Sequence, residues 1–189
     1  ADSFAAIEQR VVNEKRITWQ ELLYHLDNNW SGTDGEKARL MMKNIPRYGS
    51  GDSIADKYAV KISSLFTNAV KEKKTPNGHN MIPGIFSWAS HISMGQDVNA
   101  TPNGRFAKAP LSHGSNPDPG FRKDGALTAL SNAIASVQSG YGNASPMQVE
   151  MDPGISKNEG GLELVSNLIK THFDRGGTQI NMNVVDKQK

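Results

Sequence analysis

The stretch Met81–Gly125 reads MIPGIFSWASHISMGQDVNATPNGRFAKAPLSHGSNPDPGFRKDG and separates two parts of the chain with different character. It begins as an apolar run and continues as a long segment rich in Gly, Pro, Asn and Ser. Long segments without secondary structure are uncommon inside a compact domain, and they are usually functional or disordered. We therefore expect residues 89–125 to form a long loop that contributes to a site.

The sequence before this stretch predicts a layer of helices over residues 1–75. Apolar residues recur at helical spacing in the segments 3–15, 17–30, 36–44 and 53–73. Thr18 and Glu21 have the spacing of a capping box, in which each side chain binds the backbone N–H of the other residue. The turn chemistry of Thr75–Asn80 ends this layer.

The sequence after residue 76 predicts alternating strands and helices, and the fold class is therefore α/β. We expect strands at 81–88, 147–151 and 179–185, with helices at 126–137 and 159–175. The resulting order, strand–loop–helix–strand–helix–strand, is typical of parallel strands joined by crossovers. Parallel sheets need cover on both faces, so three strands imply an incomplete sheet. The Gln and Asn residues of the last strand either line a polar cavity or support a neighbouring loop.

The composition of the chain argues against several classes of protein and several kinds of site. The 189 residues are 37% hydrophobic and 21% charged, with a net charge of +2, which is typical of a globular protein and gives no support to nucleic-acid binding. The absence of cysteine excludes disulfides, thiolate metal sites and a cysteine nucleophile in this chain. His79, His91 and His113 lack the short spacing of a zinc site. No apolar run reaches the roughly 20 residues of a membrane span and no signal peptide is visible, so we expect a cytoplasmic protein.

Four stretches resemble the pyruvate formate-lyase family of glycyl radical enzymes. ITWQELL (17–23) with RYGSGD (47–52) resembles a helix–turn segment of the family, and MIPGIFSWASHISMG (81–95) resembles its PGxYS strand. The stretch 100–130, which begins ATPNGRFAKAPLSHG, resembles the family's long loop of the type ALPDGRxAGxPLADG. GLELVSNLIKTHFDRGGTQINMNVV (161–185) resembles the helix and strand that end in GGxHVQFNVV. These motifs occur in the family's order across nearly the whole chain.

The resemblance implies a ten-stranded α/β barrel with helices outside, of which residues 1–189 are a single segment. Residues 1–75 would form the helical layer, and residues 76–189 part of a half-barrel. The family's chemistry uses a thiyl-forming cysteine on one loop and a glycyl radical on another, installed by a radical S-adenosylmethionine activating enzyme. The resemblance also implies that the remaining polypeptide, or a complementing subunit, and this activating enzyme are partners.

This chain departs from the family at both radical-bearing positions. It has no cysteine, and it ends at VVDKQK without a loop of the type RVxGY. Gly140, in Ser-Gly-Tyr, precedes the GGTQINMN strand and follows no Arg-Val pair, so we interpret it as a loop glycine. The resemblance therefore implies a fragment that is not catalytic by itself, from a formate C-acetyltransferase or a related dehydratase or lyase of anaerobic metabolism. The alternative is a non-catalytic accessory or binding module.

Six residues are candidates for contact with substrate, and none is assigned a catalytic role. Phe86 occupies a position where the family often has a tyrosine near the substrate, and alternation along the expected strand would turn it inward. Core packing is the alternative for Phe86, Trp88 and His91. Arg105 could bind a carboxylate or phosphate through two hydrogen bonds, or form an ion pair within its loop. The full set is Phe86, Trp88, His91, Asn103, Arg105 and Asn181. We also expect self-association, because a slice of a barrel exposes strand edges and apolar faces.

Overall fold

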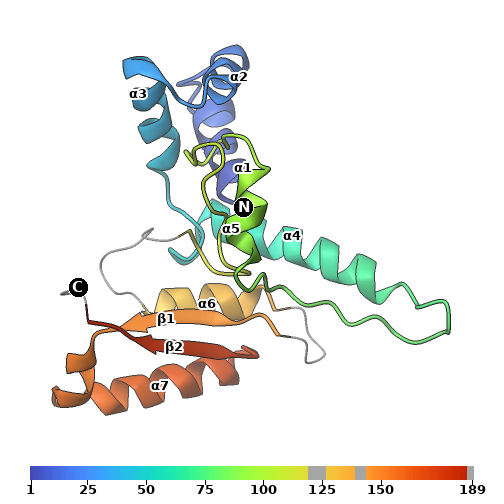
Figure 1. Ribbon diagram of the computed structural model, residues 1–189, viewed down its shortest axis with the longest axis vertical. Coiled ribbons are helices and arrows are strands. Elements are labelled where there is room, and N and C mark those ends of the chain that lie inside the picture. Colours follow the sequence, from blue (N-terminus) through green and yellow to red (C-terminus); the bar gives the residue numbers. More distant parts are fainter. Residues whose placement is uncertain (119–126, 139–143, 187–189) are drawn as a thin grey trace.

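The structure is a computed structural model that describes residues 1–118, 127–138 and 144–186. Figure 1 shows the first helices gathered at one end of an elongated molecule and a two-stranded sheet with two helices at the other end. Gly140 and the end of the long loop, 119–126, lie outside the described residues. Within the described ranges, no helix is long and apolar enough to cross a membrane.

The first part of the chain is helical, as its apolar periodicity predicts. The helices are α1 (Asp2–Ala6), which continues as a π-helical segment (Ile7–Asn13), α2 (Trp19–Asp27), α3 (Gly32–Lys43) and α4 (Ile54–Lys71). The predicted capping box is confirmed at α2, where Thr18 accepts from the Glu21 amide and Glu21 accepts from the Thr18 amide. A second capping box, Ser53 with Asp56, starts α4 and was not predicted.

A core cluster joins these helices around three fully buried side chains, Leu22, Trp30 and Met42. Trp30 follows α2 in a left-handed backbone conformation, with φ at 58°. Its indole Nε1 donates to the Arg105 carbonyl oxygen at 3.2 Å. This contact fastens the long loop to the helical layer across 75 residues of sequence.

The second part of the chain is a small α/β unit. Its elements are α6 (Leu127–Ser136), β1 (Met147–Met151), a 3-10 turn (Pro153–Lys157), α7 (Gly161–Asp174) and β2 (Ile180–Val184). The two strands are parallel, as predicted, and Val149 pairs with Met182. Ile134 of α6 and Leu168 of α7 pack with the apolar residues of both strands. The alternate residues form a polar face, consisting of Gln148, Glu150, Asn181 and Asn183.

The expected strand at 81–88 is wrong, because residues 81–87 adopt no regular secondary structure. Pro83 has no N–H to donate, and a turn starts at Trp88, whose φ is 49°. The segment still runs beside the chain that leads into β1. There Ile85 N donates to the Ala144 oxygen at 3.2 Å, and Ser145 Oγ donates to the Ile85 oxygen at 3.2 Å. The described sheet therefore has two strands rather than three.

The long loop is more ordered than its composition suggests. A short helix not predicted from the sequence, α5 (Ser90–Gln96), occupies its beginning. Gly95 of α5 lies so close to the following chain that a Cβ there would come 2.3 Å from the Ala109 oxygen. Thr101 and Arg105 then close the predicted Pro-Asn-Gly turn with an antiparallel bridge. Residues 90–118 thus fold back on themselves.

His172 of α7 gives the small α/β unit an expected dependence on pH. Its ring is fully buried, and Nδ1 lies 3.1 Å from Ser131 Oγ of α6. Burial lowers the pKa of His172, whereas the pKa of an unfolded histidine is about 6.5. The unfolded state therefore binds a proton that the folded state excludes, and the free energy of unfolding is expected to fall as pH decreases below about 6.5. Urea titrations at a series of pH values measure this loss.

The His172→Gln variant isolates this effect from other titrating groups. Asp2 has a raised pKa through burial and therefore changes stability with pH in the opposite direction. Subtracting the free energy of unfolding of His172→Gln from that of the unsubstituted protein, at each pH, cancels the contribution of Asp2. His79→Gln, at an exposed position, is the matched control. Equal pH slopes for the protein and His172→Gln would contradict the assignment.

Candidate functional site

A cavity of about 560 Å³ lies between α4, the 84–87 segment and the 112–118 part of the loop. Its apolar side is lined by Ala59, Ile62, Phe66, Ile85 and Phe86. Its polar side is lined by Asp2, Tyr48, Asn103, Ser112, Ser115, Asn116 and Asp118. Small-molecule sites commonly combine apolar walls with a few placed polar groups in this way, and we take this cavity as the candidate site.

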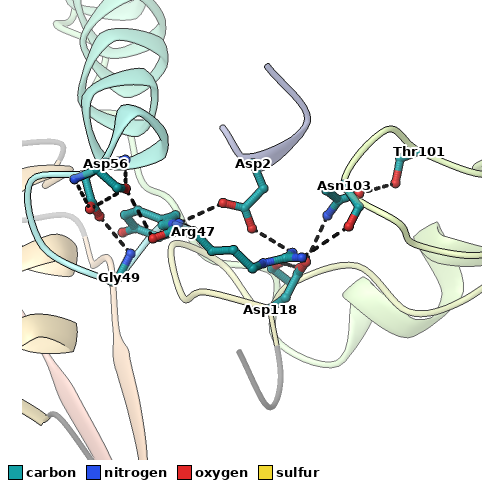
Figure 2. A network of polar contacts seen from close by, with 10 residues as sticks. Asp2, Arg47, Gly49, Asp56, Thr101, Asn103 and Asp118 are labelled. Atoms are coloured by element: carbon teal, nitrogen blue, oxygen red, sulfur yellow. Dashed lines mark hydrogen bonds and ion pairs between the residues drawn. The ribbon is translucent and has the colours of Figure 1, made fainter. Parts of the chain in front are cut away.

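Arg47 does not line the cavity, but it binds several residues that do (Figure 2). It belongs to the turn between α3 and α4 and is only 6% exposed. Its Nη2 pairs with Asp2 Oδ2 at 2.8 Å and with the Asp118 carboxylate, and its Nη1 donates to the Asn103 oxygen at 3.1 Å. The guanidinium thereby contacts three segments that are far apart in the sequence.

The Asp118 carboxylate also organises the loop itself. Asn103 Nδ2 donates to Asp118 Oδ2 at 2.9 Å, and Ser112 Oγ donates to Asp118 Oδ1. Thr101 Oγ1 donates in turn to Asn103 Oδ1 at 2.6 Å. The Arg47–Asp118 ion pair and the Asn103–Asp118 hydrogen bond therefore hold the two predicted turns, TPNGR and NPDPG, against each other.

Burial shifts the pKa values of two polar residues that line the cavity, Asp2 and Tyr48. Burial raises the pKa of Asp2, although Arg47 and the Tyr48 amide both act to lower it. Burial also raises the pKa of the Tyr48 phenol, whose hydroxyl donates to the Ser115 oxygen at 2.8 Å. Ser115 is 7% exposed, and its own Oγ is buried without a hydrogen-bond partner among the described residues. The cavity therefore has one unsatisfied hydroxyl on its wall, next to groups that already have partners.

The structure brings two of the six predicted site residues to this cavity. Phe86 and Asn103 both line it. Trp88 lies outside and is 75% exposed. His91 Nδ1 lies 2.7 Å from the Trp88 oxygen, and its ring meets that of His113 edge-on with centroids 5.0 Å apart.

The other two predicted residues, Arg105 and Asn181, make hydrogen bonds to residues nearby in the sequence. Arg105 donates to the carbonyl oxygens of Val98, Asn99 and Ala109, all within its own loop. Burial lowers the pKa of this guanidinium, although it remains charged at neutral pH, as arginine does in proteins. Asn181, on the polar face of β2, accepts from Gln179 Nε2 at 2.8 Å. Both residues lie away from the cavity lining.

Sequence reasoning missed Asp2, Arg47 and Asp118. Two of them stand in turns that were recognised, Arg47 in RYGSGD and Asp118 in NPDPG. Isolated charges in turns do not reveal their partners, since Arg47 and Asp118 are 71 residues apart. No group of three or more His, Asp or Glu residues in the described part of the chain is arranged to hold a metal ion.

The comparisons with known proteins agree with the motif pattern. A family model described as pyruvate formate lyase-like matches residues 1–95. Isethionate sulfite-lyase from Oleidesulfovibrio alaskensis is 31% identical, and the match covers 98% of this chain and 22% of that protein. Trans-4-hydroxy-L-proline dehydratase from Clostridioides difficile is 29% identical over 98% of this chain and 23% of its own length. The chain thus spans less than a quarter of the length of these relatives.

Solved structures with the same fold extend the match to the whole segment. The B12-independent glycerol dehydratase from Clostridium butyricum, in its glycerol-bound form, superposes with a TM-score of 0.88 at 28% identity, over 99% of this chain and 24% of that one. A structure concerned with 1,2-propanediol dehydration in Roseburia inulinivorans has a TM-score of 0.88 at 31% identity, over 98% of this chain and 24% of that one. Because the family model, the sequence relatives and the fold agree, the chain belongs to the pyruvate formate lyase-like family of glycyl radical enzymes.

Proposed function

We propose that this chain is one segment of a glycyl radical dehydratase or lyase that acts on a small hydroxylated substrate. The names and titles of the relatives support this substrate class. Isethionate, trans-4-hydroxy-L-proline, glycerol and 1,2-propanediol each carry a hydroxyl group on a small carbon skeleton. Dehydration or lyase chemistry is therefore favoured over formate C-acetyltransferase activity.

One observation carries the proposal. The chain matches these enzymes over 98–99% of its own length, yet it spans only 22–24% of theirs and contains no cysteine. The residues present therefore do not fit a complete radical site, and no catalytic step is assigned to them. We propose that the segment alone is not catalytic, and that the remaining polypeptide supplies the radical-bearing loops and completes a ten-stranded barrel.

The cavity is the proposed contribution of this segment to the substrate pocket. Phe86 would provide an apolar wall, and Asn103 an amide whose Nδ2 is already directed to Asp118. Two apolar side chains of α4 are exposed in this segment, Leu65 at 63% and the cavity-lining Phe66 at 52%. The remaining polypeptide would cover them. Burial of such residues is favourable by roughly 25 cal/mol per Å² of apolar surface.

Electron paramagnetic resonance tests the proposed function. The 189-residue chain, treated anaerobically with a radical S-adenosylmethionine activating enzyme, S-adenosylmethionine and reductant, is expected to give no glycyl radical doublet. The longer polypeptide encoded by the gene that contains this segment is expected to give the doublet under the same conditions. That polypeptide is then assayed with isethionate, trans-4-hydroxy-L-proline, 1,2-propanediol, glycerol and pyruvate.

Each arm of this experiment has an outcome that contradicts the proposal. A doublet from the 189-residue chain would place a radical within it. A gene without a cysteine loop upstream and an RVxGY-type loop downstream would instead favour an accessory or binding module. Turnover of pyruvate alone would exclude the proposed substrate class. A Gly→Ala change in the RVxGY-type loop of the longer polypeptide, which removes the radical position, is the control for the spectroscopic signal.

A further inference from the structure

Arg47 contacts residues that line the candidate cavity, although it does not line the cavity itself. Asp2, Asn103 and Asp118 all line the cavity, and all three bind the Arg47 guanidinium. In Figure 2 the guanidinium lies between the Asp2 carboxylate on one side and the Asn103 and Asp118 side chains on the other. Three residues of the polar side of the cavity thus bind one buried cation.

The rest of the long loop has anchors of its own. Gly104 accepts from Arg39 Nη1 at 3.2 Å, Arg105 accepts from the Trp30 indole, and the Ala107 amide donates to Asn29 at 2.7 Å. These contacts fix residues 104–107. Arg47 instead binds Asn103 and Asp118, two loop residues that line the cavity.

Charge explains why no neutral residue could replace this guanidinium. Asp2 and Asp118 both bind Arg47 Nη2 through their Oδ2 atoms, and the neighbouring Asp118 carboxylate acts, after burial, to raise the pKa of Asp2. Removing the cation would leave the buried Asp2 carboxylate and the partly exposed Asp118 carboxylate close together without compensation, and truncating one member of a buried ion pair is strongly destabilising. A lysine would keep the charge, but its ammonium lacks the planar fork that reaches Asp2, Asp118 and the Asn103 oxygen together.

We propose that Arg47 is a positioning residue that sets the polar wall of the substrate pocket by holding Asn103 and Asp118 in place. The proposal rests on the proposed function for its catalytic consequence, but its structural consequence is independent of activity. Loss of Arg47 removes its contacts with Asn103 and Asp118, which loosens the 101–103 turn and residues 112–118. Residues 104–107 keep their own anchors, and Ser115 keeps its hydrogen bond from the Tyr48 hydroxyl. The substrate would then meet a displaced wall, whereas radical formation, which needs residues outside this chain, would continue.

Hydrogen exchange on the 189-residue chain tests the structural part. In Arg47→Met, amides in 101–103 and 112–118 are expected to exchange faster, whereas those in α7 are unchanged. Arg39→Met is the matched control, because Arg39 also donates to the loop, at Gly104, but contacts no residue of the network. Asp118→Asn removes one loop partner while leaving the Arg47–Asp2 pair, and it replaces Arg47→Met if that variant does not fold. Unchanged exchange at 112–118 in the folded variants overturns the proposal, whatever the activity of the parent enzyme.

Kinetics on the longer polypeptide test the catalytic part. Displacement of substrate-contacting groups by about 1 Å can reduce catalysis by up to about 100-fold, so Arg47→Met is expected to raise KM about tenfold or more while the glycyl radical content stays at the wild-type level. Arg47→Lys is expected to restore part of this loss, and Arg39→Met to leave KM unchanged. An unchanged KM in Arg47→Met, or a loss of radical content equal to the loss of activity, overturns the positioning role. Absence of a radical in the wild-type polypeptide would instead count against the proposed function, and the exchange result would still decide the role of Arg47.

Discussion

Replacing Trp30 with alanine is expected to lower the free energy of unfolding by about 3–5 kcal/mol, the usual cost of truncating a buried aromatic residue. The side chain is 1% exposed and belongs to the core cluster of the helical layer. Truncation would also leave the Arg105 oxygen without the indole N–H. Urea denaturation followed by circular dichroism measures the change.

The chain contains its own controls for Trp30. Trp88 is 75% exposed and Trp19 is 51% exposed, so alanine at either position is expected to change the free energy of unfolding by less than about 1 kcal/mol. Trp30→Phe keeps an aromatic ring but removes the indole N–H that binds the Arg105 oxygen. Its free energy of unfolding therefore separates the contribution of packing from that of the hydrogen bond. Equal losses for Trp30→Ala and Trp88→Ala would show that Trp30 does not organise the helical core.

Replacing Leu168 with alanine is expected to cost about 2–5 kcal/mol, as large-to-small changes in a core do. Leu168 is 7% exposed and packs under the sheet with Ile134 of α6 and Val149 of β1. Because the small α/β unit has its own core cluster, the loss should be greatest there. Hydrogen exchange is therefore expected to accelerate at β1 and β2 more than in α2 and α3.

Leu162, on the same helix, is the matched control for Leu168. It is 69% exposed, and its replacement by alanine is expected to change the free energy of unfolding by less than about 1 kcal/mol. The comparison holds residue type and helix constant while burial changes. A uniform increase in exchange over the whole chain after Leu168→Ala would contradict two separable cores and indicate a single cooperative unit.

Local signals in the sequence predicted the regular elements well. Apolar residues at helical spacing located α2, α4 and α7, and the Thr18–Glu21 pair located the start of α2. Alternation in MQVEM and QINMNVV located the two strands that pair. These signals succeed because helix and strand periodicity are properties of neighbouring residues.

Burial was harder to predict than secondary structure. Leu23, Leu65 and Leu164 all fit the apolar stripes of their helices, yet each is more than half exposed. Periodicity shows which side of a helix is apolar, but only packing partners decide whether that side is covered. The proposal that a longer polypeptide covers these side chains accounts for their exposure.

The strand expected at 81–88 failed for a related reason. A strand forms only when a partner accepts and donates along its length, and residues 81–87 adopt no regular secondary structure although Ile85 N donates to the Ala144 oxygen. The missed helix α5 is seven residues long, below the length at which helical periodicity is informative. Both errors fall in the stretch where composition changes from apolar to turn-forming.

The sequence by itself determined the helices other than α5, the parallel strand pair and the motifs that mark the family, because each depends on residues close together in the chain. The tertiary structure decided the candidate site. Asp2, Arg47 and Asp118 meet only because the helical layer and the long loop fold against each other, and the buried guanidinium can be recognised only when its partners are in place. The same packing of the loop brings Phe86 and Asn103 to one cavity. Trp88 and Arg105, which were also predicted as site residues, lie outside its lining.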